Sequence, residues 1–405
     1  MRNGPTISPP LRPAGRRLRC LVLVGTRPEA IKMAPIAIGL SRRSEFETRL
    51  VLTGQHRELV DDVLDTFQLK ADINLNLMRH SQTLAGFASR ALNALHREFE
   101  KQKPDLILVQ GDTTTAFIAS LAAFYLNVTV GHVEAGLRTN NKRSPFPEEI
   151  NRRLISVIAD LHFAPTRESY ETLLREGLNP ATVYLTGNPV MDALRLTQDR
   201  GIHHARDEFP FLNADLKTIL VTAHRRENHG EPLRQICRAV ARLVESDPDV
   251  QVIWPVHPNP AVAGVVEEQL GRKERIHLVK PINYCSFVGI LALCHLVLTD
   301  SGGVQEEAPA FGKPVLVLRD TTERPEGVAA GAARLIGPSE EAIVEHGTRL
   351  LQNELEYQAM SKAVSPYGDG RAMERIVDAI LYHYGFTTSP PEPYDPFREP
   401  ALRAG

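Results

Sequence analysis

The stretch LVLTDSGGVQEEAPAFGKPVLVL, Leu296–Leu318, places a glycine pair between two apolar runs. The first run is typical of a buried strand, and the segment after the glycines is predicted to open a helix. A small-residue turn between a strand and a helix presents unpaired backbone N–H groups, which bind anions such as phosphate. The same turn is at least as common as plain chain geometry, so this stretch alone leaves both interpretations open.

The same alternation of short apolar runs and amphipathic segments recurs along the chain. It predicts an α/β fold with doubly wound parallel sheets, because strands covered by helices on both faces are apolar almost throughout. A junction near GNPVMDAL, residues 187–194, separates two such series and predicts two Rossmann-like domains facing a central cleft. The runs are LRCLVLV, DLILVQ, VTVGHV, KTILVTA, VQVIWPV, LVLTD and PVLVL, with helical segments such as AFIASLAAFYLN and PLRQICRAVARLVES between them.

Composition excludes several classes of protein. Lys and Arg number 47 against 49 for Asp and Glu, so no net field favours nucleic acid or an anionic membrane. Four cysteines without CxxC spacing indicate reduced thiols in a cytoplasmic protein, rather than a disulfide framework or a zinc site. Nowhere do 18 apolar residues run together, so no membrane-spanning helix is expected.

The two ends of the chain differ from the rest. Residues 1–17 are rich in proline and arginine, and the apolar run after them is too short for a signal peptide, so we expect a disordered extension before the first buried strand. Residues 387–405 include PPEPYDP and are likewise expected to be disordered.

Polar clusters follow six of the predicted strands. In open parallel sheets the carboxyl ends of the strands line the ligand crevice, so these clusters are expected to meet there. Any one of them alone is better explained as a solvated loop. The clusters are GTRPEAIK, QGDTTT, HVEAGLRT, AHRREN, HPNP and DSGGVQEE.

Two cations lie in the first cluster. Thr26 and Glu29 form a capping-box pattern, which places Arg27 and Lys32 near a helix N-terminus. The helix dipole disfavours positive charge there unless an anion such as a pyrophosphate lies between them. The alternative is a pair of solvated side chains, with Lys32 bound to a nearby acid.

Three acids are candidates for a reacting centre. Asp112 and Glu134 lie at strand ends, and Glu148 opens the predicted helix PEEINRRLISVIAD. For Glu148 the alternative is a stabilising role, because acids are common in a first helical turn and Arg152 follows at i+4.

The histidines leave two interpretations open. His224 and His257 lie at strand ends and could equally be hydrogen-bonded core residues. No metal-binding or dinucleotide fingerprint occurs, and Asp247 to Asp249 is interpreted as a turn.

Taken together, the motifs resemble the non-hydrolysing UDP-N-acetylglucosamine 2-epimerases. The resemblance extends in order over residues 18 to about 385. It implies a glycosyltransferase-B-like architecture, with domains 18–187 and 188–367 and a final helix, about 368–386, returning to the first domain. The motifs are GTRPEAIKMAP, TGQH, QGDTTT, HVEAGLRT, PFPEEINRR, GNPVMDA, TAHRREN, HPNP and DSGGVQEEAPAFGKPVLVLRDTTERPEG.

The resemblance also implies a role for each site residue. The catalytic set contains Asp112, Glu134 and Glu148, with His224 beside the diphosphate. For substrate binding, the resemblance implies a diphosphate turn formed by Ser301, Gly302 and Gly303. It implies that Glu307 contacts the ribose, that Phe287 contacts the uracil and that Arg324 contacts the sugar nucleotide. The substrate-binding residues implied in the first domain are Arg27, Lys32 and Arg152. A second, activating UDP-GlcNAc is implied at Gln55, Arg225 and His257.

The expected reaction is the interconversion of UDP-GlcNAc and UDP-ManNAc for cell-surface polysaccharide, in a homodimer without metal or other cofactor. Lys142, Arg143 and His229 depart from the family pattern near the expected cleft. An alternative is therefore an epimerase of another UDP-2-acetamido sugar, such as a diacetamido uronic acid. A UDP-sugar glycosyltransferase of the same architecture and a non-catalytic UDP-sugar sensor are further alternatives.

Overall fold

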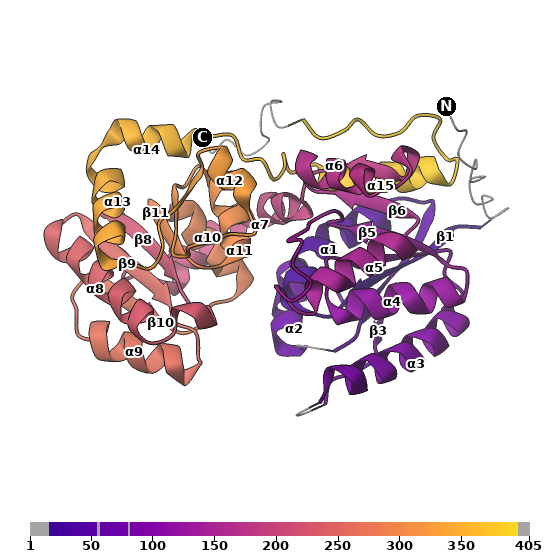
Figure 1. The fold of residues 1–405 in the computed structure, drawn as a ribbon, viewed down its shortest axis with the longest axis horizontal. Helices are drawn as coiled ribbons and strands as arrows, with labels where there is room; N and C mark the ends of the chain where they lie inside the picture. The colour runs from indigo at the N-terminus through magenta and orange to yellow at the C-terminus, as the bar shows by residue number, and fades with distance from the viewer. Residues whose placement is uncertain (1–15, 55–56, 80–81, 396–405) are drawn as a thin grey trace. The chain divides into compact units, whose positions relative to one another are not determined.

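The computed structural model describes residues 16–54, 57–79 and 82–395, which form two compact units (Figure 1). The first unit contains the described residues up to Ala193 together with Gly368–Asp395. The second unit contains Leu194–Tyr367. The chain passes from the first to the second inside helix α7 (Pro189–Glu208), within the 187–194 stretch.

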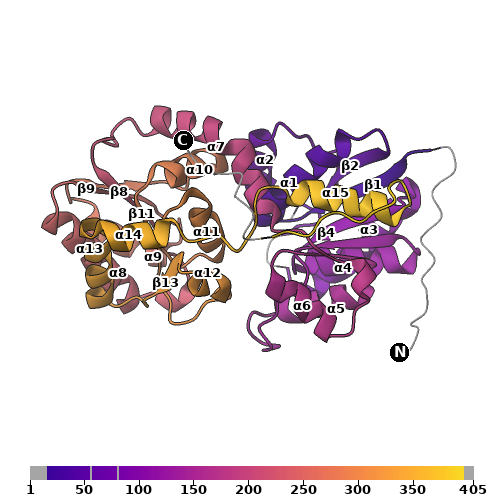
Figure 2. The ribbon, with the colours of Figure 1, turned by 90° about the horizontal axis from the view of Figure 1, so that it is seen from above.

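A parallel sheet with the order β3-β2-β1-β4-β5-β6-β7 forms the centre of the first unit. Helices cover both faces of this sheet, with α1 and α15 on one side and α4 and α5 on the other (Figure 2). The strands are β1 (Leu18–Val24), β2 (Phe46–Leu52), β3 (Ile73–Asn74), β4 (Leu106–Gln110), β5 (Thr129–Val133), β6 (Leu161–Ala164) and β7 (Val183–Leu185). The helices are α1 (Arg27–Ser41), α2 (Arg57–Thr66), α3 (Leu84–Gln102), α4 (Thr114–Tyr125), α5 (Glu148–Ile158), α6 (Arg167–Arg175) and α15 (Ala372–His383).

The second unit repeats this architecture with the parallel order β10-β9-β8-β11-β12-β13. Its strands are β8 (Lys217–Thr222), β9 (Val250–Pro255), β10 (Ile276–Val279), β11 (Leu296–Thr299), β12 (Val315–Val317) and β13 (Ala333–Leu335). Its helices are α8 (Glu231–Ser246), α9 (Pro260–Leu270), α10 (Tyr284–Leu293), α11 (Gly302–Glu307), α12 (Pro325–Ala329), α13 (Glu340–Gln352) and α14 (Glu354–Ser361). The predicted α/β class with two parallel sheets is confirmed.

Burial explains why the apolar runs became central strands. Every residue of β4 and β11 is buried, and the large side chain of Trp254 on β9 is fully enclosed in the core of the second unit. Each buried aliphatic side chain contributes about 1.5–3 kcal/mol relative to exposure, so these strands fix their own position in the sheet. All seven predicted runs are observed as β1, β4, β5, β8, β9, β11 and β12.

Helix α15 returns the chain to the first unit, where Figure 2 shows it in yellow beside α1 and β1. Asp192 is fully buried, and its two carboxylate oxygens accept hydrogen bonds from the backbone N–H groups of Ala372 and Met373, each at 3.0 Å. Arg375 forms a buried bidentate pair with Asp369 at 2.6 and 2.7 Å. These contacts satisfy the N-terminal amides of α15 and fix the helix to the first unit.

The expectation of a disordered tail from residue 387 is wrong for residues 387–395. Tyr394 is 2% exposed, and its backbone N–H donates to the carbonyl of Leu185 at 2.8 Å. The guanidinium of Arg375 lies 5.7 Å from the Tyr394 ring centroid. One buried aromatic side chain thus anchors a proline-rich segment that composition alone assigns to disorder. Residues 1–15 and 396–405 of the two predicted extensions lie outside the described residues.

Within the described ranges, none of the helices has the length and apolar character that crossing a membrane requires.

Candidate functional site

The loops after β1, β4 and β5 meet at one edge of the first sheet because β1, β4 and β5 are neighbours in it. Lys32, from α1, places its Nζ 2.7 Å from both carboxylate oxygens of Glu134. Both side chains are almost completely buried, at 11% and 4% exposed. Gln110, at the end of β4, also donates to the Glu134 carboxylate. The sequence alternative in which Lys32 pairs with an acid is therefore observed, and that acid is itself a candidate catalytic residue.

The backbone of Glu134 is unusual. Its φ of 62° lies in the left-handed region, which non-glycine residues adopt rarely and at an energetic cost. The backbone N–H of Ala135 donates to Phe163, which ties the turn to β6. Gly136 follows with φ 99°, where a Cβ atom would overlap the Ser169 carbonyl. The turn therefore presents Glu134 in a conformation that the neighbouring elements impose.

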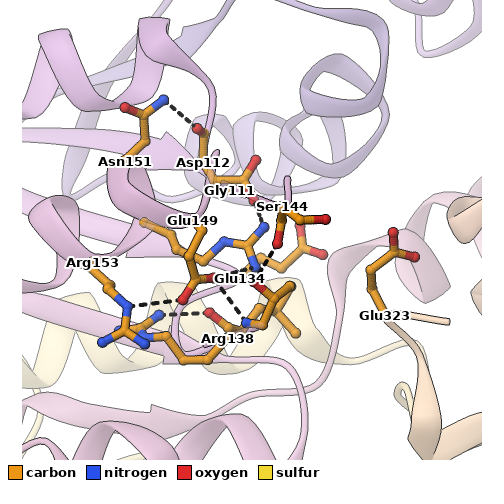
Figure 3. A network of polar contacts seen from close by, with 12 residues as sticks. Gly111, Asp112, Glu134, Arg138, Ser144, Glu149, Asn151, Arg153 and Glu323 are labelled. Carbon is orange, nitrogen blue, oxygen red and sulfur yellow. Dashed lines mark hydrogen bonds and ion pairs between the residues drawn. The ribbon is translucent and has the colours of Figure 1, made fainter. Parts of the chain in front are cut away.

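Asp112 is bound from α5. Its Oδ2 accepts a hydrogen bond from the Arg152 guanidinium at 2.5 Å, and its carbonyl accepts one from Asn151 at 2.9 Å (Figure 3). Desolvation raises the pKa of Asp112, and the nearby Glu134 carboxylate adds to the rise while Arg152 opposes it. A carboxyl group whose pKa is raised is better able to exchange a proton near neutral pH.

Glu149 organises the loop between β5 and α5 and was not singled out from the sequence. Only 1% exposed, it accepts hydrogen bonds from the backbone N–H groups of Thr139 at 2.9 Å and Asn140 at 3.2 Å (Figure 3). It also binds Arg153 Nε at 2.9 Å and Arg152 at 3.4 Å. Although burial alone raises the pKa of Glu149, the Thr139 amide and the Arg153 guanidinium bring that pKa below its ordinary value.

Glu148 differs from the adjacent Glu149 in its burial and in its contacts. It opens α5, as expected, and is half-buried. The i,i+4 pair with Arg152, which was the structural alternative for Glu148, does not form, because Arg152 binds Asp112 and Glu149 instead. Among the described residues, Glu148 has no hydrogen bond or ion pair.

A second buried carboxylate, Glu29, joins the loops after β1 and β4. It is 2% exposed and accepts hydrogen bonds from the backbone N–H groups of Gly25 at 2.8 Å and Thr26 at 2.6 Å. It also accepts one from the Thr113 hydroxyl at 2.6 Å. Desolvation raises the pKa of Glu29 in spite of these bonds. Arg27 and Asp112 therefore lie on two loops that are fixed to each other.

In the second unit, His224 follows β8 and lies against His257, which follows β9. The two imidazole rings are 5.5 Å apart and inclined by 11°. His257 is exposed, and its Nδ1 accepts a hydrogen bond from the Asn259 backbone N–H at 3.1 Å. Burial lowers the pKa of His224, while the carboxylate of Asp300 opposes this effect. The histidines are thus at the sheet edge rather than in the core.

The glycine pair that follows β11 is not required by chain geometry. Neither Gly302 nor Gly303 has a positive φ. A Cβ atom on Gly303 would meet nothing within 4 Å, and one on Gly302 would meet only Arg225, at 3.8 Å. Ser301 caps the short helix α11, with its N–H donating to Thr299 Oγ1 at 2.9 Å. The turn leaves space beside its backbone.

The remaining predicted residues of the second unit lie around this turn or on α10. Glu307 is 7% exposed on α11, and the Arg324 guanidinium binds the neighbouring Glu306. Phe287, on α10, is half-buried against the core.

Several predicted site residues are brought together within each unit. Direct contacts join Lys32 to Glu134 and Asp112 to Arg152 in the first, and His224 to His257 in the second. Gln55 lies outside the described residues.

Comparison with known proteins identifies the family. Residues 39–381 match the model of the UDP-N-acetylglucosamine 2-epimerase family. The chain is 49% identical over 381 residues to the UDP-N-acetylglucosamine 2-epimerase of Bacillus subtilis (strain 168), covering 94% of this chain and 99% of that protein. It is 48% identical over 369 residues to the enzyme of the same name from Escherichia coli (strain K12), covering 90% and 98%.

A solved structure agrees. The UDP-GlcNAc 2-epimerase of Neisseria meningitidis, bound to UDP-GlcNAc, superposes with a TM-score of 0.84 at 45% identity, covering 90% of this chain and 100% of that one. With the fold, the sheet-edge loops and these relatives in agreement, the chain belongs to the UDP-N-acetylglucosamine 2-epimerase family.

Proposed function

We propose that the protein interconverts UDP-GlcNAc and UDP-ManNAc by eliminating UDP and adding it back. The observation that best supports this is the network of Lys32, Glu134, Asp112 and Arg152. It holds two carboxylates at one sheet edge, each fixed by a cation. The names of the relatives support the same sugar nucleotide.

The chemistry explains why carboxylates are needed. The C2–H of an N-acetylhexosamine is not acidified by an adjacent carbonyl, so its direct deprotonation is slow. If the C1–O bond breaks first, UDP leaves with the electron pair and the cationic character at C1 acidifies C2–H. A carboxylate then takes the proton to give 2-acetamidoglucal, and UDP adds back with protonation on the other face. Asp112, Glu134 and Glu148 form the proposed proton-transfer set.

The second unit is proposed to hold UDP. The space beside Gly302 and Gly303 suits close approach of a diphosphate to the backbone, since among the described residues an added Cβ would meet only the Arg225 guanidinium, at 3.8 Å from Gly302. Glu307 is assigned to the ribose, Phe287 to the uracil and Arg324 to the sugar nucleotide. His224 is assigned to the diphosphate, and Arg27 and Lys32 are assigned to substrate binding.

A second UDP-GlcNAc is proposed as an activator, held by Gln55, Arg225 and His257. His257 is exposed and Arg225 lies near the diphosphate turn, which supports an anion site that extends beyond His224. If this holds, UDP-ManNAc alone turns over slowly until a trace of UDP-GlcNAc is added. Equal initial rates with and without the trace contradict it.

A homodimer is supported by one exposed apolar face. Ile150, Leu154 and Val157 recur at helical spacing on α5, and Val157 is 83% exposed. Phe146, just before the helix, is 69% exposed. Large apolar side chains gathered on one helix face are typical of an interface between subunits.

The test of the activity needs no acceptor. The purified protein is incubated with UDP-GlcNAc alone in deuterated water, and the products are followed by NMR. We expect UDP-ManNAc with deuterium at C2. Sugar transfer only on addition of an acceptor identifies a glycosyltransferase, and binding without turnover identifies a sensor. Activity restricted to a UDP-2,3-diacetamido uronic acid identifies the alternative substrate.

A further inference from the structure

Asp300, directly after β11, is a fully buried carboxylate that was not among the predicted site residues. Its Oδ2 accepts hydrogen bonds from the backbone N–H groups of His224 at 2.9 Å and Arg225 at 2.8 Å. It also accepts one from Asn228 Nδ2 at 2.9 Å. This single oxygen therefore ties the loop after β8 to the end of β11.

The other oxygen of Asp300 is in a different situation. Oδ1 is buried and accepts no hydrogen bond from the described residues. It lies 3.6 Å from Nδ1 of His224. A buried carboxylate oxygen without a donor is rare in folded proteins and calls for a physical reason. The edge of the His224 imidazole, which faces Oδ1, provides this reason.

We propose that Asp300 is a positioning residue that holds the protonated Nδ1 of His224, so that Nε2 faces the diphosphate of the bound sugar nucleotide and, in the imidazolium form that the two anions stabilise, donates a hydrogen bond to it. The proposal rests on the proposed function, because the diphosphate is the ligand assigned to this turn. His257 holds one face of the ring and Asp300 holds one edge. Within the described chain, Nε2 of His224 has no hydrogen-bond partner.

The charged groups around His224 show how Asp300 affects the pKa of that histidine. Burial, His257, Arg225 and His229 all lower the pKa of His224, and Asp300 is the group that raises it. A carboxylate beside Nδ1 also favours the tautomer with its proton on Nδ1, and it stabilises the imidazolium. Removing this carboxylate should therefore move the titration of His224 to lower pH.

The experiment follows His224 directly. The full-length protein is labelled with ¹⁵N-histidine, and the His224 resonances are assigned by their loss in His224→Gln. In the ligand-free wild type we expect the neutral imidazole to carry its proton on Nδ1; a proton on Nε2 overturns the proposal. Because this measurement needs no variant of Asp300 and no turnover, it stands even if Asp300→Asn does not fold or the protein lacks epimerase activity.

Two variants distinguish the effect of the Asp300 charge on His224 from the effect of the hydrogen bonds that hold the loop after β8. Asp300→Asn keeps the shape of the side chain and removes its charge, so His224 should titrate at lower pH and kcat at neutral pH should fall roughly tenfold or more. Asn228→Ala removes one hydrogen bond to Asp300 and leaves the charge, so the His224 titration should stay near that of the wild type. An unmoved His224 titration in Asp300→Asn, or an equal shift in Asn228→Ala, overturns the proposal.

Discussion

Lys32 and Glu134 are 102 residues apart in the chain, yet Lys32 Nζ lies 2.7 Å from both oxygens of the Glu134 carboxylate. The pair is almost completely buried. Two charges removed from water in this way depend on each other, because neither can be solvated when its partner is absent. The pair therefore couples the stability of the first unit to its candidate chemistry.

Replacing Lys32 by methionine should destabilise the protein by about 3–5 kcal/mol, since it leaves the Glu134 carboxylate buried without its cation. Denaturant unfolding measures this loss. The double variant Lys32→Met with Glu134→Gln should recover much of the stability but not the activity. Additive losses in the double variant would contradict the coupling.

Replacing Asp112 by asparagine should lower kcat by a factor on the order of 100 or more while UDP binding survives, because the amide preserves shape and removes proton transfer. The raised pKa of Asp112 also predicts that the rate falls on acidification before ordinary carboxylates protonate, and that this limb disappears in the variant. Asp192→Asn is the control, since Asp192 is a buried carboxylate of the same unit that accepts two hydrogen bonds from backbone N–H groups of α15. It should cost stability and leave the pH profile unchanged. A wild-type rate in Asp112→Asn removes this residue from the proton-transfer set.

Replacing Gly303 by alanine should leave stability unchanged within about 1 kcal/mol, because its φ is not positive and a Cβ meets open space. Affinity for UDP, measured by calorimetry, should nevertheless fall roughly tenfold or more if the diphosphate approaches this backbone. Gly264→Ala on α9, which is equally unhindered, should leave UDP affinity unchanged. Wild-type affinity in Gly303→Ala would mean that the glycines serve no diphosphate.

Replacing Val157 by aspartate should convert the proposed dimer to a monomer, because a charge would be buried in the apolar face of α5. Analytical ultracentrifugation measures the mass. Leu355→Asp, at a side chain that is 84% exposed on α14, is the matched control and should not change the mass. A monomeric wild-type protein would refute the dimer itself.

The central strands could be predicted because burial on both faces leaves a continuous apolar run, as in LILVQ of β4. Strand β2 was not predicted, because Glu47, Thr48 and Arg49 interrupt its apolar run. The strands β3, β6, β7, β10 and β13 were not predicted either. Loops that follow central strands could likewise be placed at one edge, which is why Asp112 and Glu134 were found. What pairs with each acid depends on contacts across the sheet that no local pattern encodes.

The neighbours Glu148 and Glu149 illustrate this limit. Both are acids in the first turn of α5, and the sequence pointed to Glu148. The structure buries Glu149, which shares the inward side of the helix with Arg152 and Ile155. A signal was available, because Glu149 precedes Arg152 and Arg153 by three and four residues. The sequence analysis assigned Glu29 only to a capping box, which the structure contains, and assigned no role to Asp300, because a sequence shows the charge of a residue but not its burial.

The return of α15 to the first unit has a consequence for synthesis on the ribosome. The buried Asp192 carboxylate is hydrogen-bonded by the backbone N–H groups of Ala372 and Met373, which are synthesised about 180 residues later. The first unit therefore cannot be completed until nearly the whole chain has been translated. The described residues of the second unit, Leu194–Tyr367, form one contiguous stretch that leaves the ribosome before α15. The part of the protein made first is therefore the part finished last, and a nascent chain that stalls before α15 presents an open first unit beside a folded second one.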